Sequence, residues 1–183
     1  MTKVRQMTIL AFLSALSFLF MFALEFPLPF FPPYLKYDPS QLCGLLAAFS
    51  FGPAAGFLVE LIKSILFFLS GKSADGIVGA AAALVAGASF VVVAGRIYHA
   101  GKGKSLAPGL IIGTIVMTVV MVSANYFFFL PLWGMPTSQI GMPLILAMVG
   151  FNIVKGILTS LLTVIILRAL EGKAILQRLQ TGH

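Results

Sequence analysis

Long apolar segments with almost no charge dominate this sequence and constrain its fold more than any other feature. A helix that crosses the hydrocarbon core of a bilayer needs about 20 mostly apolar residues. We identify six candidates, at residues 7–24, 40–51, 54–69, 76–95, 107–126 and 143–168. The Gly52-Pro53 pair separates the second from the third, because proline after glycine breaks a helix. The sequence therefore predicts an all-α integral membrane protein with six transmembrane helices in a single membrane domain, residues 1–183.

The composition excludes the common soluble classes. Of the 183 residues, 60% are hydrophobic and 9% are charged, whereas about 25% are charged in a typical soluble domain. A soluble chain of this length could not bury so much apolar surface in one core. A net charge of +7 would suggest nucleic acid as the partner of a soluble protein. Here the basic residues are few and scattered between apolar segments, so we expect a lipid bilayer and no nucleic acid.

The basic residues also predict how the helices are oriented. With six spans, eight of the twelve Lys and Arg residues fall on one side of the membrane: Lys3, Arg5, Arg96, Lys102, Lys104, Arg168, Lys173 and Arg178. Only Lys36 and Lys72 fall on the other side, and Lys63 and Lys155 lie within spans. Because basic residues are enriched in cytoplasmic loops, the pattern predicts that both termini are cytoplasmic.

The predicted extracellular segment 25–39 contains five prolines interleaved with aromatic residues. Proline fixes φ and stiffens the backbone, so this segment suits a rigid lid over a pocket that opens outward. Its polar side chains, which would face a ligand, are Tyr34, Lys36, Tyr37 and Asp38. The alternative is a belt of aromatic residues at the membrane interface, although a belt needs no proline-stiffened backbone.

Two charged residues, Glu60 and Lys63, lie within the third predicted helix. An ionised group at the bilayer centre costs about 2.5–3.5 kcal/mol on insertion scales. The i,i+3 spacing places both on one face of the helix, where they can pair. This pattern fits either a structural ion pair or the polar wall of a ligand cavity.

The later helices carry further polar residues at membrane depth. Asn125 and Tyr126 end the fifth predicted helix, and Asn152 and Lys155 lie three residues apart in the sixth. Amides offer both a donor and an acceptor, and lysine offers donors, so these residues could converge on a polar, planar ligand. Hydrogen bonds between helices would explain the asparagines but not a lysine without a partner. The pattern therefore favours a ligand site.

Several kinds of chemistry have no support in the sequence. The strings Gly71-Lys72-Ser73 and Gly103-Lys104-Ser105 lack the earlier glycine that a phosphate-binding loop requires. No Cys/His cluster has the spacing of a metal site, and no catalytic constellation is visible. We therefore expect neither an enzyme nor a resident cofactor or metal, and the chain itself shows no means of using ATP.

Ala11 and Ala15 form a small-xxx-small pair in the first predicted helix. Small residues one turn apart let another helix approach closely. Such pairs also arise by chance in alanine-rich sequences, where they serve internal packing. The pair is therefore a candidate docking strip whose meaning depends on its context.

Taken together, these residues resemble the riboflavin-binding S component of energy-coupling factor (ECF) vitamin transporters. The resemblance covers about residues 7–170 and is carried by the Ala11/Ala15 pair, segments 25–39, 51–56, 60–63 and 151–156, and Asn125-Tyr126. It implies six helices with both termini inside, in the cell membrane of a prokaryote. It also implies one riboflavin bound from outside, with the polar residues above as its contacts.

The same resemblance implies partners: a transmembrane coupling subunit that docks on Ala11 and Ala15, and two ATP-binding subunits. Two other interpretations stay open. The chain could be an S component for another vitamin, or a self-contained secondary transporter in which Glu60 and Lys63 relay ions. The six predicted helices show no obvious inverted repeat, which is a poor match to secondary transporters.

Overall fold

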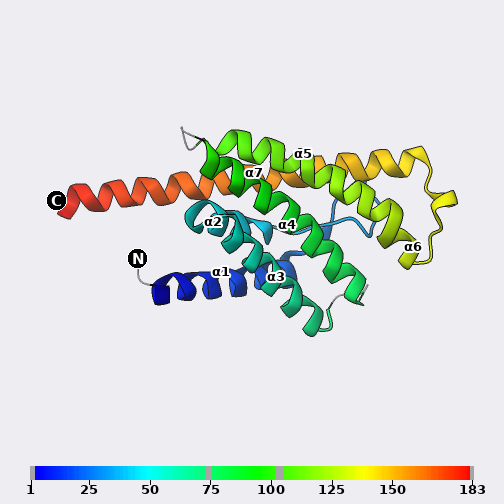
Figure 1. Cartoon of the computed structure of the whole chain (residues 1–183), viewed down its shortest axis with the longest axis horizontal. Coiled ribbons are helices and arrows are strands. Elements are labelled where there is room, and N and C mark those ends of the chain that lie inside the picture. The colour runs from blue at the N-terminus through cyan, green and yellow to red at the C-terminus, as the bar shows by residue number, and fades with distance from the viewer. Residues whose placement is uncertain (1–2, 73–75, 102–104, 182–183) are drawn as a thin grey trace.

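The computed structural model describes residues 3–72, 76–101 and 105–181, and these form a helical bundle (Figure 1). The all-helical class predicted from the sequence is confirmed. The main helices are α1 (Lys3–Leu24), α2 (Gln41–Phe51), α3 (Pro53–Leu69), α4 (Gly76–Ala100), α5 (Leu106–Ala124) and α7 (Met142–Thr181). Both ends of the chain lie at the same end of the molecule, and the last turns of α7 extend beyond the other helices (Figure 1).

Within the described residues, four helical stretches are long and apolar enough to cross a membrane: Lys3–Leu24, Gly76–Ala100, Leu106–Leu132 and Met142–Ala169. The remaining two are shorter, because α2 has 11 residues and α3 has 17. At about 1.5 Å per residue, α2 alone reaches roughly half of a 30 Å hydrocarbon core. Crossing by α2 and α3 therefore remains a prediction, and so does the orientation of the termini. Lys102 and Lys104, which support that orientation, lie outside the described residues.

The chain turns sharply between α2 and α3 at Gly52, whose φ of +101° favours a residue without a Cβ. Pro53 follows in the first turn of α3, where its missing N–H leaves no hydrogen bond broken. The two short helices are therefore separate elements that pack against each other.

The fifth helix does not end at Tyr126, where the sequence pattern places its boundary. It continues as a π-helical segment, η1 (Asn125–Phe129), and then as one more turn, α6 (Leu130–Leu132). A short 3₁₀ turn, η2 (Thr137–Gln139), leads into α7. A π-helical turn inside an α-helix commonly marks a functional site.

The segment between α1 and α2 contains two short antiparallel strands, β1 (Phe26–Pro27) and β2 (Lys36–Tyr37), that pair with each other. The proline-rich segment between them is thereby closed into a compact loop. Pro27 can lie in a strand because a two-stranded pair has an unpaired edge.

Apolar and polar side chains are distributed as expected for a protein that faces lipid. Large apolar side chains are exposed on the outer faces of several helices, among them Leu19, Phe57, Ile111 and Leu161. Hydroxyl side chains such as Ser17, Thr159 and Thr163 are buried inside. Helices α4 and α5 lie in very close contact, because a Cβ on Gly109 would come 2.7 Å from the carbonyl oxygen of Ala94.

Candidate ligand-binding site

A cavity of about 100 Å³ lies among α1, α3, α4, η1 and α7, beneath the loop that contains β1 and β2. Loop residues Tyr34, Lys36 and Asp38 line it from one side, and Asn125, Asn152 and Lys155 line it from the helices. The structure thus brings together six of the residues that the sequence analysis selected as ligand contacts. A larger groove, of about 1060 Å³, lies between α5 and α7 and is mostly apolar. The smaller cavity is the better candidate site, because the two asparagines, Asp38 and Lys155 all line it.

The two asparagines are fixed by their own helices. The Asn125 amide donates to the carbonyl oxygen of Met121 at 2.8 Å, and the Asn152 amide donates to that of Met148 at 2.8 Å. Both side chains are buried. An amide group carries a second N–H and an oxygen, so each asparagine can still offer a donor and an acceptor to a ligand in the cavity.

An ion pair joins the loop to α7 at the edge of the cavity. Lys155 Nζ lies 3.1 Å from Asp38 Oδ2, and both side chains are less than 10% exposed. Burial alone would raise the pKa of the Asp38 carboxyl, but the ammonium groups of Lys155 and Lys63 and hydrogen bonds from Ser40 and Lys155 outweigh it and hold that pKa at about 2. The Asp38 side chain is therefore an anion at neutral pH.

Two buried polar groups on the cavity wall have no hydrogen-bond partner among the described residues. They are the hydroxyl of Tyr34 and the indole N–H of Trp133, whose rings lie 6.1 Å apart. Burial raises the pKa of the Tyr34 hydroxyl, which therefore stays protonated at neutral pH. Buried polar groups are nearly always paired in native proteins. These two groups can therefore form hydrogen bonds with polar atoms of a ligand in the cavity.

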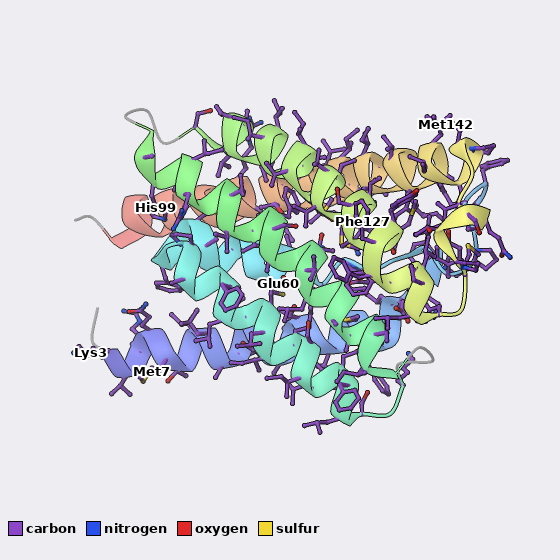
Figure 2. All side chains as sticks on the ribbon, turned by 45° about the vertical axis from the view of Figure 1, so that its right-hand side comes forward. Lys3, Met7, Glu60, His99, Phe127 and Met142 are labelled. Carbon is purple, nitrogen blue, oxygen red and sulfur yellow. The ribbon has the colours of Figure 1, made fainter. Side chains whose placement is uncertain are left out.

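The remaining selected residues lie outside the cavity lining. Tyr37 is buried and packs edge-on against Phe26, and Tyr126 packs against Phe127. Glu60 and Lys63 form a fully buried ion pair in α3. Figure 2 labels Glu60 in the middle of the bundle. The i,i+3 pairing expected from the sequence is present, but it stands behind the cavity wall rather than on it.

Some residues in the cavity lining or beside it were not selected as site residues from the sequence. One wall consists of the small α4 residues Gly79, Ala82, Ala83 and Ala86. Trp133 also lines the cavity, although an aromatic residue near a helix end fits an interfacial belt equally well. Ser40, at the start of α2, is fully buried beside Asp38. A serine before a helix predicts an ordinary N-cap, but the Ser40 hydroxyl makes no cap hydrogen bond.

The candidate docking residues lie on the outer face of α1. Ala11 and Ala15 are both exposed, whereas Ser14 and Ser17 of the same helix are buried. The small-residue strip therefore does not serve packing inside this chain. It is open to a neighbour in the membrane.

The fold and the cavity define a membrane-embedded binding protein, with lipid-facing helices around a polar cavity closed by a loop. Residues 5–167 match the family described as "ECF transporter, substrate-specific component". The chain belongs to this family. Its members are transport components, so the expectation that the chain is not an enzyme is confirmed.

Individual relatives agree with this assignment. The chain is 41% identical to "Riboflavin transporter RibU" of Staphylococcus aureus (strain TCH60), over 94% of this chain and 93% of that protein. It is 32% identical to "Riboflavin transporter FmnP" of Bacillus subtilis (strain 168), over 86% of this chain and 87% of the relative. A solved structure described as "Structure and mechanism of the S component of a bacterial ECF transporter" superposes with a TM-score of 0.84. That structure is 41% identical, and the match covers 94% of this chain and 99% of that one.

Proposed function

We propose that this protein is the riboflavin-binding S component of an ECF transporter in the cell membrane of a prokaryote. It captures riboflavin from outside and delivers it to the cytoplasm with the help of partners that hydrolyse ATP. The observation that carries the proposal is the convergence of Asn125, Asn152, Lys155 and Asp38 on one cavity beneath the loop. The relatives named as riboflavin transporters supply the identity of the vitamin.

The chemistry of the cavity suits a flavin. The pyrimidine edge of the flavin ring alternates carbonyl oxygens and nitrogens. The two asparagines can donate to these atoms or accept from their N–H groups, and Lys155 can donate to them. The apolar remainder of the ring can lie against Phe151 and Trp133, which both line the cavity. The ribityl hydroxyls can be reached by Lys36 and Asp38 at the loop side. Tyr37, Tyr126, Glu60 and Lys63 support these contacts from behind the lining.

The loop between α1 and α2 serves as a lid. At about 100 Å³ the cavity is smaller than the roughly 300–1,000 Å³ of typical ligand sites, so a flavin cannot enter without displacing part of the lining. The loop is held to the helices at the cavity by the Asp38–Lys155 ion pair. We infer that the loop moves outward to admit riboflavin. In this arrangement six helices cross the membrane, both termini are cytoplasmic and the lid is extracellular.

We infer that transport requires partners, because no ATP-binding loop occurs in the sequence and the chain belongs to a family of substrate-specific transporter components. We infer that a transmembrane coupling subunit docks on the exposed strip at Ala11 and Ala15, and that two ATP-binding subunits drive transport. Close approach of a partner helix depends on the absence of bulk at such a strip. The outward position of both alanines supports this role.

The decisive experiment is purification without added ligand, followed by an absorbance spectrum. A yellow protein with flavin bands, in a stoichiometry of about one flavin per chain, supports the proposal. A colourless protein that also fails to bind added riboflavin but binds another vitamin contradicts it. Uptake into cells that lack the coupling subunit and the ATPases distinguishes the remaining alternative. A self-contained secondary transporter would still take up riboflavin there, whereas an S component would not.

A further inference from the structure

A chain of buried polar contacts runs from α3 through the loop to the cavity. Glu60 forms an ion pair with Lys63, and Lys63 Nζ donates to the Ser40 hydroxyl oxygen at 3.1 Å. The Ser40 hydroxyl in turn donates to one oxygen of the Asp38 carboxylate, and the other oxygen accepts from Lys155. All five residues are buried. Only the last two, Asp38 and Lys155, line the cavity.

The charges along this chain alternate and sum to zero. Glu60 and Asp38 are acidic, and Lys63 and Lys155 are basic, so each ammonium group has a carboxylate beside it. Lys63 occupies the middle, because its ammonium group contacts Glu60 and also reaches Asp38 through Ser40. Removing one charge from such a buried set leaves another without compensation. If Glu60 were neutral, Lys63 would be drawn toward Asp38 and would compete with Lys155 for the same carboxylate.

Glycines on two neighbouring helices leave room for the Glu60 side chain. A Cβ built on Gly44 of α2 or on Gly87 of α4 would collide with the Glu60 carboxylate. The carboxylate therefore occupies space that a Cβ at either glycine would fill. One of its oxygens has no hydrogen-bond partner among the described residues. Stability alone gives little reason to retain a buried ion pair, since an apolar pair of similar volume often serves equally well.

We propose that Glu60, Lys63 and Ser40 are positioning residues that hold Asp38, and through it the Lys155 ammonium group, at the cavity wall in the geometry that binds ligand. This inference rests on the proposed riboflavin-binding function. It assigns Glu60 and Lys63 a role without direct contact with riboflavin. Within this set of contacts, only Asp38 and Lys155 reach the cavity. The buried pair in α3 determines, through Asp38, where the Lys155 ammonium group stands.

A double-mutant cycle on riboflavin affinity tests this role. Glu60→Gln should raise the Kd about 10-fold, within the range of coupling between sites that communicate through contacts. In a Lys155→Met background, the same substitution should change the Kd by less than about 2-fold, because the group that it positions is absent. A merely structural role predicts the same fold-change in both backgrounds, and that result would overturn the proposal. Lys72→Met, at an exposed lysine outside the chain of contacts, is the control and should leave the Kd unchanged.

A milder variant decides the question if Glu60→Gln fails to fold. Ser40→Ala removes the hydroxyl between Lys63 and Asp38 but keeps all four charges. It should also weaken binding, and its effect should also vanish in the Lys155→Met background. Equal effects of Ser40→Ala in the two backgrounds, or no effect in either, would contradict the proposal.

The same cycle on the melting temperature of the ligand-free protein separates this inference from the proposed function. If the wild-type chain does not bind riboflavin, the proposed function fails. The proposed positioning role then still predicts that Ser40→Ala and Lys155→Met change the melting temperature in a non-additive way, because both residues belong to one set of polar contacts. Additive changes would show that these polar contacts do not act as a unit, and that result would contradict the proposed positioning role. If the wild type binds riboflavin but the changes in binding free energy caused by the single substitutions add up in the double variants, only the positioning role fails.

Discussion

Lys155 Nζ lies 3.1 Å from the carboxylate of Asp38, although the two residues are 117 positions apart in the sequence. This pair is the ionic link between the loop that covers the cavity and the long helix α7 that forms its wall. A ligand that enters the cavity meets both partners. Opening the loop must therefore separate the pair or carry it along, which makes Asp38 and Lys155 central to binding and to access.

The first prediction concerns the polar contacts on α7. Asn152→Ala and Lys155→Ala should each weaken riboflavin binding by about 1–3 kcal/mol, because each leaves a polar group of the ligand without its partner. Quenching of tryptophan fluorescence measures the binding directly, since Trp133 is the single tryptophan and lines the cavity. Titrations of both variants that match the wild type would remove these residues from the site. Lys72→Ala, at an exposed lysine, is the matched control and should titrate normally.

The second prediction concerns the loop. If residues 25–39 act as a lid, riboflavin should slow hydrogen exchange of their amides more than that of segment 96–105, the predicted cytoplasmic loop. The physical reason is that a bound ligand holds the lid closed, whereas the described residues of segment 96–105 (96–101 and 105) do not line the cavity. Hydrogen exchange with mass spectrometry, with and without riboflavin, measures this difference. Equal protection of the two segments would favour an interfacial aromatic belt.

The third prediction separates docking from binding. Ala15→Trp places a large side chain on the exposed face of α1 and should block contact with the coupling subunit. The purified variant should still bind riboflavin, because neither Ala11 nor Ala15 lines the cavity. Co-purification with the coupling subunit and ATP-driven uptake should both fail.

A matched substitution controls for bulk alone. Ala107, at the start of α5, is also exposed, and Ala107→Trp should leave assembly and uptake intact. Normal assembly of Ala15→Trp would show that the strip on α1 is not the docking face. If Ala15→Trp loses riboflavin binding but still binds the coupling subunit, the assignments of the docking face and of the binding cavity are reversed.

The fourth prediction concerns pH. The pKa of Asp38 is lowered from 3.8 to about 2, so its contribution is fully present above the usual value and is lost only as the pH falls through about 2. No histidine lines the described cavity. The affinity for riboflavin should therefore stay constant between about pH 6 and pH 8, a range in which an ordinary histidine would titrate. Fluorescence titrations across this range check it, and a clear transition within it would show that another group controls binding.

The sequence contains enough information to select most of the polar residues of the cavity but not to bring them together. Asn125, Asn152 and Lys155 stand out because polar groups are rare and costly in apolar helices. The partner of Lys155 could not be found in this way, since Asp38 lies in a distant loop and no local spacing relates the two. The small α4 residues were also hidden, because alanine and glycine at a cavity wall look the same as alanine and glycine at a helix contact.

The fold shows the same division between local and distant information. The all-helical class follows from the long apolar segments, which leave few other ways to satisfy the backbone in a membrane. The extension of α5 through η1 to Leu132 could not be read from the pattern, because Phe127 and Phe128 fit an interfacial loop as well as a helix. The β1–β2 pair escaped for a similar reason, since prolines argue against strands of ordinary length.

The wall formed by Gly79, Ala82, Ala83 and Ala86 has a consequence for selectivity. Their side chains are hydrogen atoms and methyl groups, which contact a ligand through dispersion and offer no hydrogen-bond donor or acceptor. Discrimination between vitamins thus falls to the opposite, polar side of the cavity. Riboflavin analogues that are modified on the edge facing α4 should be taken up almost as fast as riboflavin. Analogues that are modified on the edge facing the polar residues should not be taken up. The same smooth surface that accommodates riboflavin would then be the route by which a toxic mimic enters the cell.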